Sequence, residues 1–252
     1  MNKSILNKEV QVYIDTHLNV DVHQLAMGKS PFPAISAREL AVQITSKKKA
    51  EKKLPTWFQQ EFIYYPEPLS IEQCSSEKTA AHKASLVSGQ VIDLTGGFGV
   101  DAYYFSRQAD SVIHCEINDD LSAIAKHNAE VLGRSNLTFL DTDGITYLQT
   151  VDRKFDTIYI DPARRSDSGK VFMLKDCSPN VVAHIDLLLE KAVQVIIKTS
   201  PLLDITAGIR ELKDVAEVHV LSTRNECKEL LFILRKDNKT TPKIVSTTIN
   251  ED

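Results

Sequence analysis

From residue 77 onward, short apolar runs alternate with helix-like segments, and this alternation constrains the fold more than any other feature of the sequence. The apolar runs are continuous, without the polar residue at every second position that marks a sheet with one solvated face. They cover residues 91–95, 111–117, 137–141, 156–161 and 193–199. Continuous runs separated by helices are typical of a parallel sheet covered on both faces, so we predict an α/β fold.

The last two expected strands, 215–222 and 229–235, are joined by a short stretch without a helix. We expect them to pair antiparallel at one edge of the sheet. With the five earlier runs they give a seven-stranded, Rossmann-like sheet whose last strand is antiparallel, in a domain that spans residues 71–236. Residues 237–252 are polar, and we expect a flexible tail there.

Residues 1–70 are predicted to form a small N-terminal helical domain. Ser36 and Glu39 have the spacing of a capping box at the start of a helix-like segment. Five of the nine prolines of the chain lie in this part. They indicate an extended connector between the helices and the α/β domain.

The composition excludes several classes of protein. A content of 42% hydrophobic and 25% charged residues is that of an ordinary globular protein. No apolar run approaches the ~20 residues of a membrane span, and the N-terminus lacks the apolar core of a secretory signal. We therefore expect a cytoplasmic protein with no membrane partner. The cysteines lack the C-x-x-C spacing of zinc sites, so we also expect no metal and no disulfide framework: Cys74, Cys115, Cys177 and Cys227.

Charge is distributed unevenly along the chain. The net charge is −4, but residues 1–55 hold nine Lys or Arg against five Asp or Glu, a net of +4. Much of this excess is one run of lysines: Lys47, Lys48, Lys49, Lys52 and Lys53. Such a run on a helix is either an electrostatic footprint for the phosphates of RNA or a solvated helix face.

Glycines cluster once, directly after the first expected strand. The chain has 9 glycines in 252 residues, about half of the usual ~7%, and three of them are Gly96, Gly97 and Gly99. Glycine in such a turn lets the backbone approach a ligand and lets the next helix pack closely. Asp93 precedes the turn, and Glu116 ends the next strand, where a carboxylate can bind both hydroxyls of a ribose. This combination predicts a nucleotide site; the alternative is a tight turn beside a surface Glu.

The spacing of the turn departs from the dinucleotide fingerprint G-x-G-x-x-G, because Ala102 occupies its third glycine position. The segment DLTGGFGVD instead resembles the motif D/E-x-G-x-G-x-G of class I S-adenosylmethionine-dependent methyltransferases, with Thr95 in place of the first glycine. This resemblance implies that S-adenosylmethionine is the cofactor. It also implies that the methionine and sulfonium part faces Asp93, Thr95, Gly96, Gly97 and Gly99.

The same resemblance implies roles for two later strand ends. Glu116 would hold the ribose. Asp143, after the third strand, would bond the adenine amine, with Gly144 beside it. Asp143 is equally suited to cap the N-terminus of the following helix, so both roles stay open.

The fourth strand ends in DPARR, at the edge of the sheet where the glycine turn is expected. Asp161 and Pro162 resemble the start of the D/N-P-P-aromatic loop of amino-methyltransferases, although the second proline and the aromatic residue are missing. We expect Asp161 to accept a proton or a hydrogen bond from a nucleophilic N–H, with Lys198 as its charge partner. Arg164 and Arg165 are candidates to bind a phosphate or a base edge. Alternatively, Asp161 caps a turn and the arginines are solvated.

DPAR also resembles the RNA 5-methyluracil methyltransferases, which carry a cysteine nucleophile at the end of the fifth strand. That end reads Lys198, Thr199 and Ser200 here, without a cysteine. The covalent route to carbon 5 needs a thiolate. We therefore favour direct transfer to a nitrogen or oxygen, which needs mainly positioning and a proton acceptor.

Several segments together extend the resemblance over about residues 20–235. QCSSEKTA, DLTGGFGVD, IAKHNAEVLG, YIDPARR, KTSPLLDI and NECKELL resemble a family of class I methyltransferases common in Bacteroidetes. Members carry an N-terminal helical region and a C-terminal ferredoxin-like or THUMP-like domain, and the family is similar to RNA guanine amino-methyltransferases. Because this chain stops soon after the last expected strand, we expect that C-terminal domain to be absent from it.

The patterns together predict an S-adenosylmethionine-dependent methyltransferase that acts on a base nitrogen of RNA. Two alternatives keep the same fold. One is a methyltransferase for a protein or a small molecule, and the other is a non-catalytic binding module.

Overall fold

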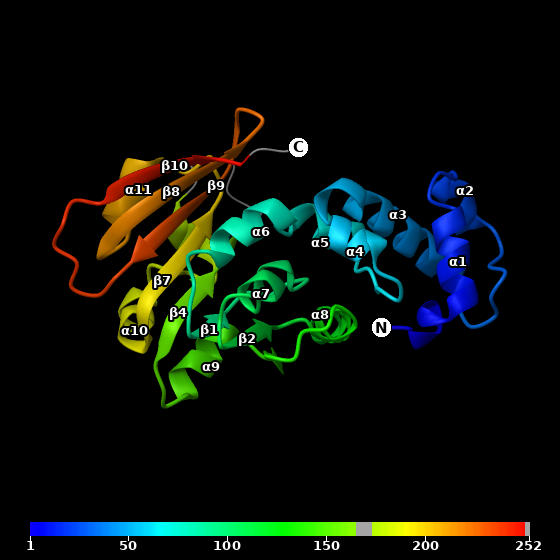
Figure 1. The fold of residues 1–252 in the computed structure, drawn as a ribbon, viewed down its shortest axis with the longest axis horizontal. Helices are drawn as coiled ribbons and strands as arrows, with labels where there is room; N and C mark the ends of the chain where they lie inside the picture. Colours follow the sequence, from blue (N-terminus) through cyan, green and yellow to red (C-terminus); the bar gives the residue numbers. More distant parts are fainter. Residues whose placement is uncertain (165–172, 250–252) are drawn as a thin grey trace.

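A computed structural model describes residues 1–164 and 173–249 of the chain. Among these residues, eight strands form one mixed sheet in the order β10-β8-β9-β7-β4-β1-β2-β3 (Figure 1). The strands are β1 (Gln90–Asp93), β2 (Ser111–Glu116), β3 (Leu137–Asp141), β4 (Phe155–Ile160), β7 (Ala192–Thr199), β8 (Val215–Thr223), β9 (Glu226–Leu234) and β10 (Lys243–Thr248). The first five of them pair in parallel, which confirms the predicted α/β fold with a largely parallel sheet.

The C-terminal end of the sheet differs from the prediction. The sheet has eight strands rather than seven, because Lys243–Thr248 form β10, which pairs parallel to β8 at the edge. The expectation of a flexible tail over residues 237–252 is therefore wrong for this strand. Its side chains stay exposed or half-buried, so backbone pairing rather than apolar burial holds it. Its β-branched residues, Ile244, Val245, Thr247 and Thr248, were a local strand signal that the polar surroundings obscured. The predicted antiparallel pair is confirmed as β8 and β9, with β9 inserted between β7 and β8.

Helices cover both faces of the sheet, and each face has its own apolar cluster. Along β1, Val91 belongs to one cluster and Ile92 to the other, as expected for a strand buried on both sides. The first face carries α6 (Glu77–Ala84), α7 (Val100–Phe105) and α8 (Asp119–Val131). The second carries α9 (Gly144–Thr150), α10 (Ile185–Lys191) and α11 (Ile205–Glu211).

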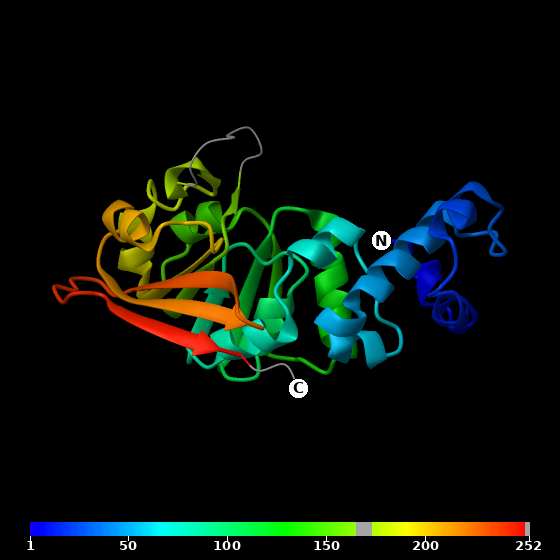
Figure 2. The same cartoon turned by 90° about the horizontal axis from the view of Figure 1, so that it is seen from above.

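The N-terminal helices extend from one end of the molecule, as both views show (Figure 1, Figure 2). They are η1 (Lys3–Leu6), α1 (Lys8–Thr16), α2 (Val22–Met27), α3 (Ala37–Lys53), α4 (Pro55–Gln59) and α5 (Pro68–Gln73). The predicted capping box at the start of α3 is confirmed, since Ser36 and Glu39 bond reciprocally.

These helices share an apolar cluster with the first face of the sheet. The ring of Trp57, on α4, meets that of Tyr103, on α7, edge to face with centroids 4.8 Å apart. The side-chain amide of Asn128, on α8, bonds both the backbone N–H and the carbonyl of Tyr64 at 2.9 Å. The connector before α5 is therefore anchored to the α/β part. The predicted boundary between two domains near residue 70 stays a prediction.

Candidate active site

The glycine turn lies between β1 and α7, as predicted, and close packing explains why glycine is needed there. Gly97 and Gly99 adopt φ angles of 55° and 84°, which other residues rarely tolerate. A Cβ added to Gly96 would come within 2.3 Å of Nε2 of His114, a buried side chain on β2. The turn therefore sits directly against the neighbouring strand.

Glu116, at the end of β2, bonds the backbone of the turn. Its Oε2 accepts a hydrogen bond from the N–H of Gly97, and its Oε1 accepts one from the N–H of Asn118, both at 2.8 Å. The carboxylate predicted to hold a ribose is thus fixed beside the glycines by two backbone donors.

Thr95 joins the turn to the loop after β4, a role that the sequence pattern did not reveal. Its backbone N–H donates to Oδ1 of Asp93 at 3.0 Å. Its hydroxyl oxygen accepts a hydrogen bond of 2.7 Å from the backbone N–H of Asp161. A glycine at position 95 has no side chain to make the second bond. The threonine that departs from the methyltransferase motif therefore links the end of β1 to the loop after β4.

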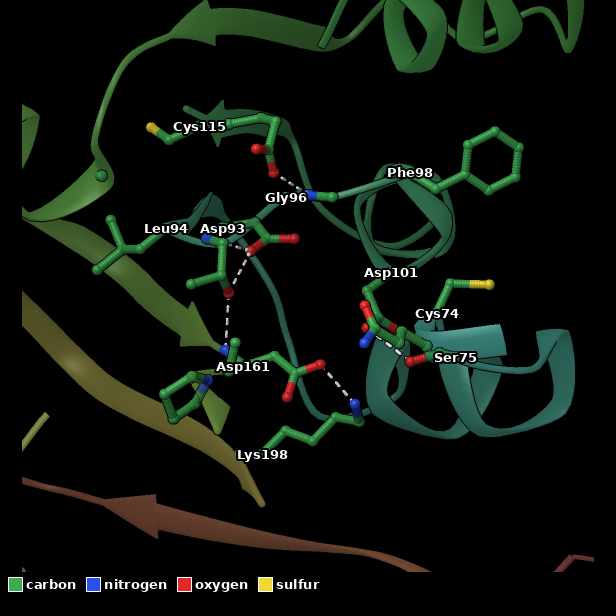
Figure 3. A pocket seen from close by; sticks show the side chains of 18 of the residues that line it. Cys74, Ser75, Asp93, Leu94, Gly96, Phe98, Asp101, Cys115, Asp161 and Lys198 are labelled. Atoms are coloured by element: carbon green, nitrogen blue, oxygen red, sulfur yellow. Dashed lines mark hydrogen bonds and ion pairs between the residues drawn. The ribbon is translucent and has the colours of Figure 1, made fainter. Parts of the chain in front are cut away.

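Asp161 and Lys198 form an ion pair at the ends of the neighbouring strands β4 and β7. Lys198 Nζ lies 2.5 Å from Asp161 Oδ2, and both side chains are labelled in Figure 3. Burial lowers the pKa of Lys198, but the carboxylates of Asp161, Glu229 and Asp101 outweigh burial and raise this pKa above its ordinary value. Lys198 is therefore a cation that holds one oxygen of Asp161.

Asp143 and Gly144 lie where β3 leads into α9. Oδ1 of Asp143 accepts a hydrogen bond of 2.7 Å from the N–H of Thr146, so the helix-cap alternative is confirmed for this oxygen. A Cβ on Gly144 would approach the carbonyl oxygen of Leu94 to 2.4 Å, so glycine lets α9 begin against the end of β1. The predicted contact of Asp143 with adenine stays a prediction.

One cavity of about 750 Å³ gathers the predicted cofactor and catalytic residues at the carboxyl ends of the strands. It is lined by Asp93, Thr95, Gly96, Gly97, Gly99, Glu116, Asp143, Gly144, Asp161, Pro162 and Lys198. Arg164 belongs to β5 (Ala163–Arg164), which pairs with β6 (Cys177–Ser178). Arg165 lies outside the described residues.

A buried charge network adjoins the cavity and escaped the sequence patterns. Lys83, fully buried on α6, lies 3.0 Å from Asp101 Oδ1 and 3.1 Å from Glu229 Oε1. The hydroxyls of Ser75 and Tyr159 donate to Oδ2 of Asp101 at 2.8 and 2.9 Å. Burial alone would raise the pKa of Asp101, but Lys83 is the largest opposing influence and the pKa is lowered on balance. Asp101 is therefore ionised, and with Ser75 it lines the cavity.

An apolar residue at the rim was also missed. Ile117 follows Glu116 and keeps 73% of its side chain exposed while lining the cavity. An exposed isoleucine beside a buried strand end offers a flat ligand a surface on which to pack. The sequence could have indicated this residue, because Ile117 directly follows Glu116, the acidic residue that ends β2.

The lysines predicted as an RNA footprint are largely engaged within the protein. Lys47 pairs with Asp15, Lys48 with Glu51, and Lys49 with Glu72. Lys53 donates to the carbonyls of Ile71 and Glu72 at the end of α5. The run therefore includes far less uncompensated positive charge than its sequence suggests.

Within residues 1–164 and 173–249, no cluster of His, Cys, Asp and Glu is arranged to hold a metal ion. The same residues include no helix long and apolar enough to cross a membrane.

Comparisons with known proteins relate the chain to methyltransferases. No family model matches it. The crystal structure of a protein from Porphyromonas gingivalis, assigned as a methyltransferase, aligns with a TM-score of 0.81 and 30% identity, over 95% of this chain and 60% of that one. The 23S rRNA (uracil(1939)-C(5))-methyltransferase RlmD of Photobacterium angustum is 33% identical over 100 residues, 38% of this chain and 45% of the relative.

An uncharacterised S-adenosylmethionine-dependent methyltransferase of Mycobacterium tuberculosis is 27% identical over 161 residues, 64% of this chain and 43% of the relative. The chain thus spans less than half the length of these curated relatives. The comparisons confirm the kinship with S-adenosylmethionine-dependent methyltransferases that the motifs indicate.

Proposed function

From this kinship we propose that the chain binds S-adenosylmethionine and transfers its methyl group to a nitrogen of an RNA base. The observation that carries the proposal is the Asp161–Lys198 pair, which lines the same cavity as the glycine turn and Glu116. A carboxylate, a lysine that pairs with it and a glycine turn thus line one cavity, and this arrangement supports the proposal.

The cavity is large enough for a small-molecule cofactor. Its volume of about 750 Å³ lies within the ~300–1,000 Å³ of small-molecule sites. A Cβ added to Gly97 would meet only the carbonyl oxygen of Thr95, at 3.9 Å. The space beside Gly97 at the turn is therefore open to a ligand. We propose that Glu116 binds the ribose hydroxyls, that Asp143 bonds the adenine amine, and that Ile117 packs against the adenine ring.

S-adenosylmethionine supplies a methyl group on a positively charged sulfur. For the acceptor, we propose that the Asp161 oxygen not held by Lys198 accepts a hydrogen bond from the reacting N–H. This bond orients the nitrogen. The carboxylate then takes up the proton that the nitrogen gives up when it is methylated. Lys198 fixes the carboxylate, and Pro162 shapes the loop that carries it.

The cysteines of the cavity support nitrogen rather than carbon as the acceptor. Burial raises the pKa of Cys74 to about 11 and that of Cys115 to about 12, so both thiols are protonated near neutral pH. The end of β7 carries Lys198, Thr199 and Ser200. A covalent route through carbon 5 of a pyrimidine needs a thiolate, and these residues do not supply one.

RNA as the acceptor is supported by the names of relatives, one a 23S rRNA methyltransferase and another an RNA methyltransferase of Mycoplasma mobile. We propose Arg164 and Arg165 as contacts for a phosphate or a base edge. The alternative of a protein or small-molecule acceptor has one observation in its favour. Four of the five lysines in the α3 run have partners within the chain, which weakens α3 as an RNA-binding surface.

Transfer of tritiated methyl groups to RNA and to protein tests the proposal, with substrates prepared from cells that lack the gene. We expect label in RNA, and label in protein alone would overturn the RNA assignment. Asp161→Ala should abolish transfer while cofactor affinity stays nearly intact. Asp186→Ala is the matched control, because Asp186 pairs with Lys213 at an exposed site outside the cavity. Full activity of Asp161→Ala would refute the role of Asp161.

A further inference from the structure

Five carboxylate side chains line the cavity, and four of them have partners suited to a negative charge. The five are Asp93, Asp101, Glu116, Asp143 and Asp161. Asp101 and Asp161 each pair with a lysine. Glu116 and Asp143 accept backbone N–H bonds near the rim. Lysine cations and N–H donors are partners that the oxygens of a carboxylate accept.

Asp93 differs from the other four in both burial and partners. Only 1% of it is exposed. Its Oδ1 accepts hydrogen bonds from the N–H and the hydroxyl of Thr95, at 3.0 and 3.4 Å. No ion pair joins it to a cation among the residues that the structure describes. Three acidic neighbours, Asp101, Asp161 and Glu116, act on it instead.

Burial raises the pKa of Asp93 well above its ordinary value, and the three acidic neighbours raise it further. The backbone bond from Thr95 opposes this shift only in part. A buried carboxyl group without a cation keeps its proton, because transfer of an uncompensated charge out of water is costly.

We propose that Asp93 gives up its proton to solvent when the cationic methionine moiety of S-adenosylmethionine enters the cavity, so that cofactor binding releases a proton. The O–H bond of the carboxylic acid breaks, the proton passes to the buffer, and the carboxylate pairs with the positive ligand. This inference rests on the proposed cofactor. It adds a linkage between pH and binding, in which the affinity for the cofactor rises with pH by up to about tenfold per unit.

The other titratable groups around Asp93 do not supply this proton. Burial lowers the pKa of His114, on β2, and so favours the neutral ring. Burial raises the pKa of Cys115, also on β2, and that of Tyr159, on β4, so both stay protonated. The charged groups on the remaining elements are already paired: Lys83 on α6, Asp101 on α7, Asp161 after β4 and Lys198 on β7.

Isothermal titration calorimetry in two buffers of different ionisation enthalpy, from about pH 5 to pH 8, counts the protons released. Three ligands show which positive group pairs with the Asp93 carboxylate. S-adenosylmethionine has a sulfonium and an ammonium, S-adenosylhomocysteine has the ammonium alone, and 5′-methylthioadenosine has neither. We expect release of up to one proton with S-adenosylmethionine and none with 5′-methylthioadenosine. Release with S-adenosylhomocysteine identifies the ammonium as sufficient, and its absence identifies the sulfonium.

Asp93→Asn should bind without releasing a proton, because the amide has the shape of the protonated acid. Asp156→Asn is the matched control: Asp156 lies on β4, accepts a backbone bond from Gln90 and does not line the cavity. It should release as many protons as the wild type. Binding of S-adenosylmethionine to the wild type without proton exchange would overturn the inference and leave the proposed function standing, as would unchanged release by Asp93→Asn. No binding at all would overturn the proposed function, and the inference with it.

Discussion

Replacing Lys83 by methionine tests the buried charge network directly. Lys83 Nζ lies within 3.0 Å of Asp101, 3.1 Å of Glu229 and 2.6 Å of the Ser75 hydroxyl, and the side chain is fully buried. The methionine has a similar volume but removes the ion-pair partner of two buried carboxylates, for which Lys198 stays as the nearby cation. Breaking a buried pair in this way costs about 3–5 kcal/mol. A loss of that size is a large part of the ~5–15 kcal/mol that holds a typical domain folded.

The dependence of this loss on pH follows from the lowered pKa of Asp101. Burial raises this pKa, but Lys83 is the largest of the influences that lower it on balance. A depressed carboxyl pKa contributes stability that is present above the unfolded pKa of ~3.9 and lost as pH falls through the folded pKa. Lys83→Met removes this contribution. Its deficit relative to wild type should therefore be largest near neutral pH and shrink below about pH 4.

Urea unfolding followed by circular dichroism measures the effect at several pH values. Lys213→Met is the control, because Lys213 pairs with Asp186 at an exposed site and should change stability by less than ~1 kcal/mol. Adding Asp101→Asn and Glu229→Gln to Lys83→Met should recover much of the loss, since no buried charge is then stranded. A loss below ~1 kcal/mol at neutral pH, or an equal loss at every pH, would refute the argument.

Three further predictions concern the cavity itself. The raised pKa of Asp93 contributes stability at low pH that is lost as pH rises through the folded value, so Asp93→Asn should gain stability relative to wild type between about pH 5 and pH 8 in urea unfolding. Gly96→Ala places a Cβ within 2.3 Å of the ring of His114; we expect a loss of about 1–3 kcal/mol together with weaker cofactor binding by calorimetry. Thr95→Val strands the backbone N–H of Asp161, and should lower methyl transfer and cost about 1–3 kcal/mol. Thr95→Ser should restore both, and equal behaviour of Val and Ser would contradict the bridge.

The sequence was informative where a pattern is local. Continuous apolar runs located the parallel strands, because a strand buried on both faces must be apolar along its length. The glycine turn and the strand-end acids were recognised for the same reason, since each motif spans only a few residues. β10 was missed because the residues around it are polar and it pairs with β8, a partner more than twenty residues away, although its β-branched residues are of the type enriched in strands.

The charge network lay beyond any local pattern. Lys83 and Glu229 are separated by 146 positions in the chain, and only the folded sheet brings β9 next to α6. The lysine run of α3 was ambiguous for the same reason. Its ion-pair partners include Asp15 and Glu72, which the sequence alone does not place beside it.

The placement of counter-charges divides the cavity into two ends. At the β4 and β7 end, lysines neutralise Asp161 and Asp101. At the β2 and β3 end, Glu116 accepts hydrogen bonds from two backbone N–H groups, and Asp143 accepts them from the N–H and the hydroxyl of Thr146. In the proposed binding mode, the second end faces the ribose and adenine, and Asp161, held by Lys198, faces the neutral acceptor. Asp93 ends β1 between the two ends. Among residues 1–164 and 173–249, the N–H and the hydroxyl of Thr95 donate to it and no lysine forms an ion pair with it, so in the proposed binding mode its charge is the one that a cationic ligand sets.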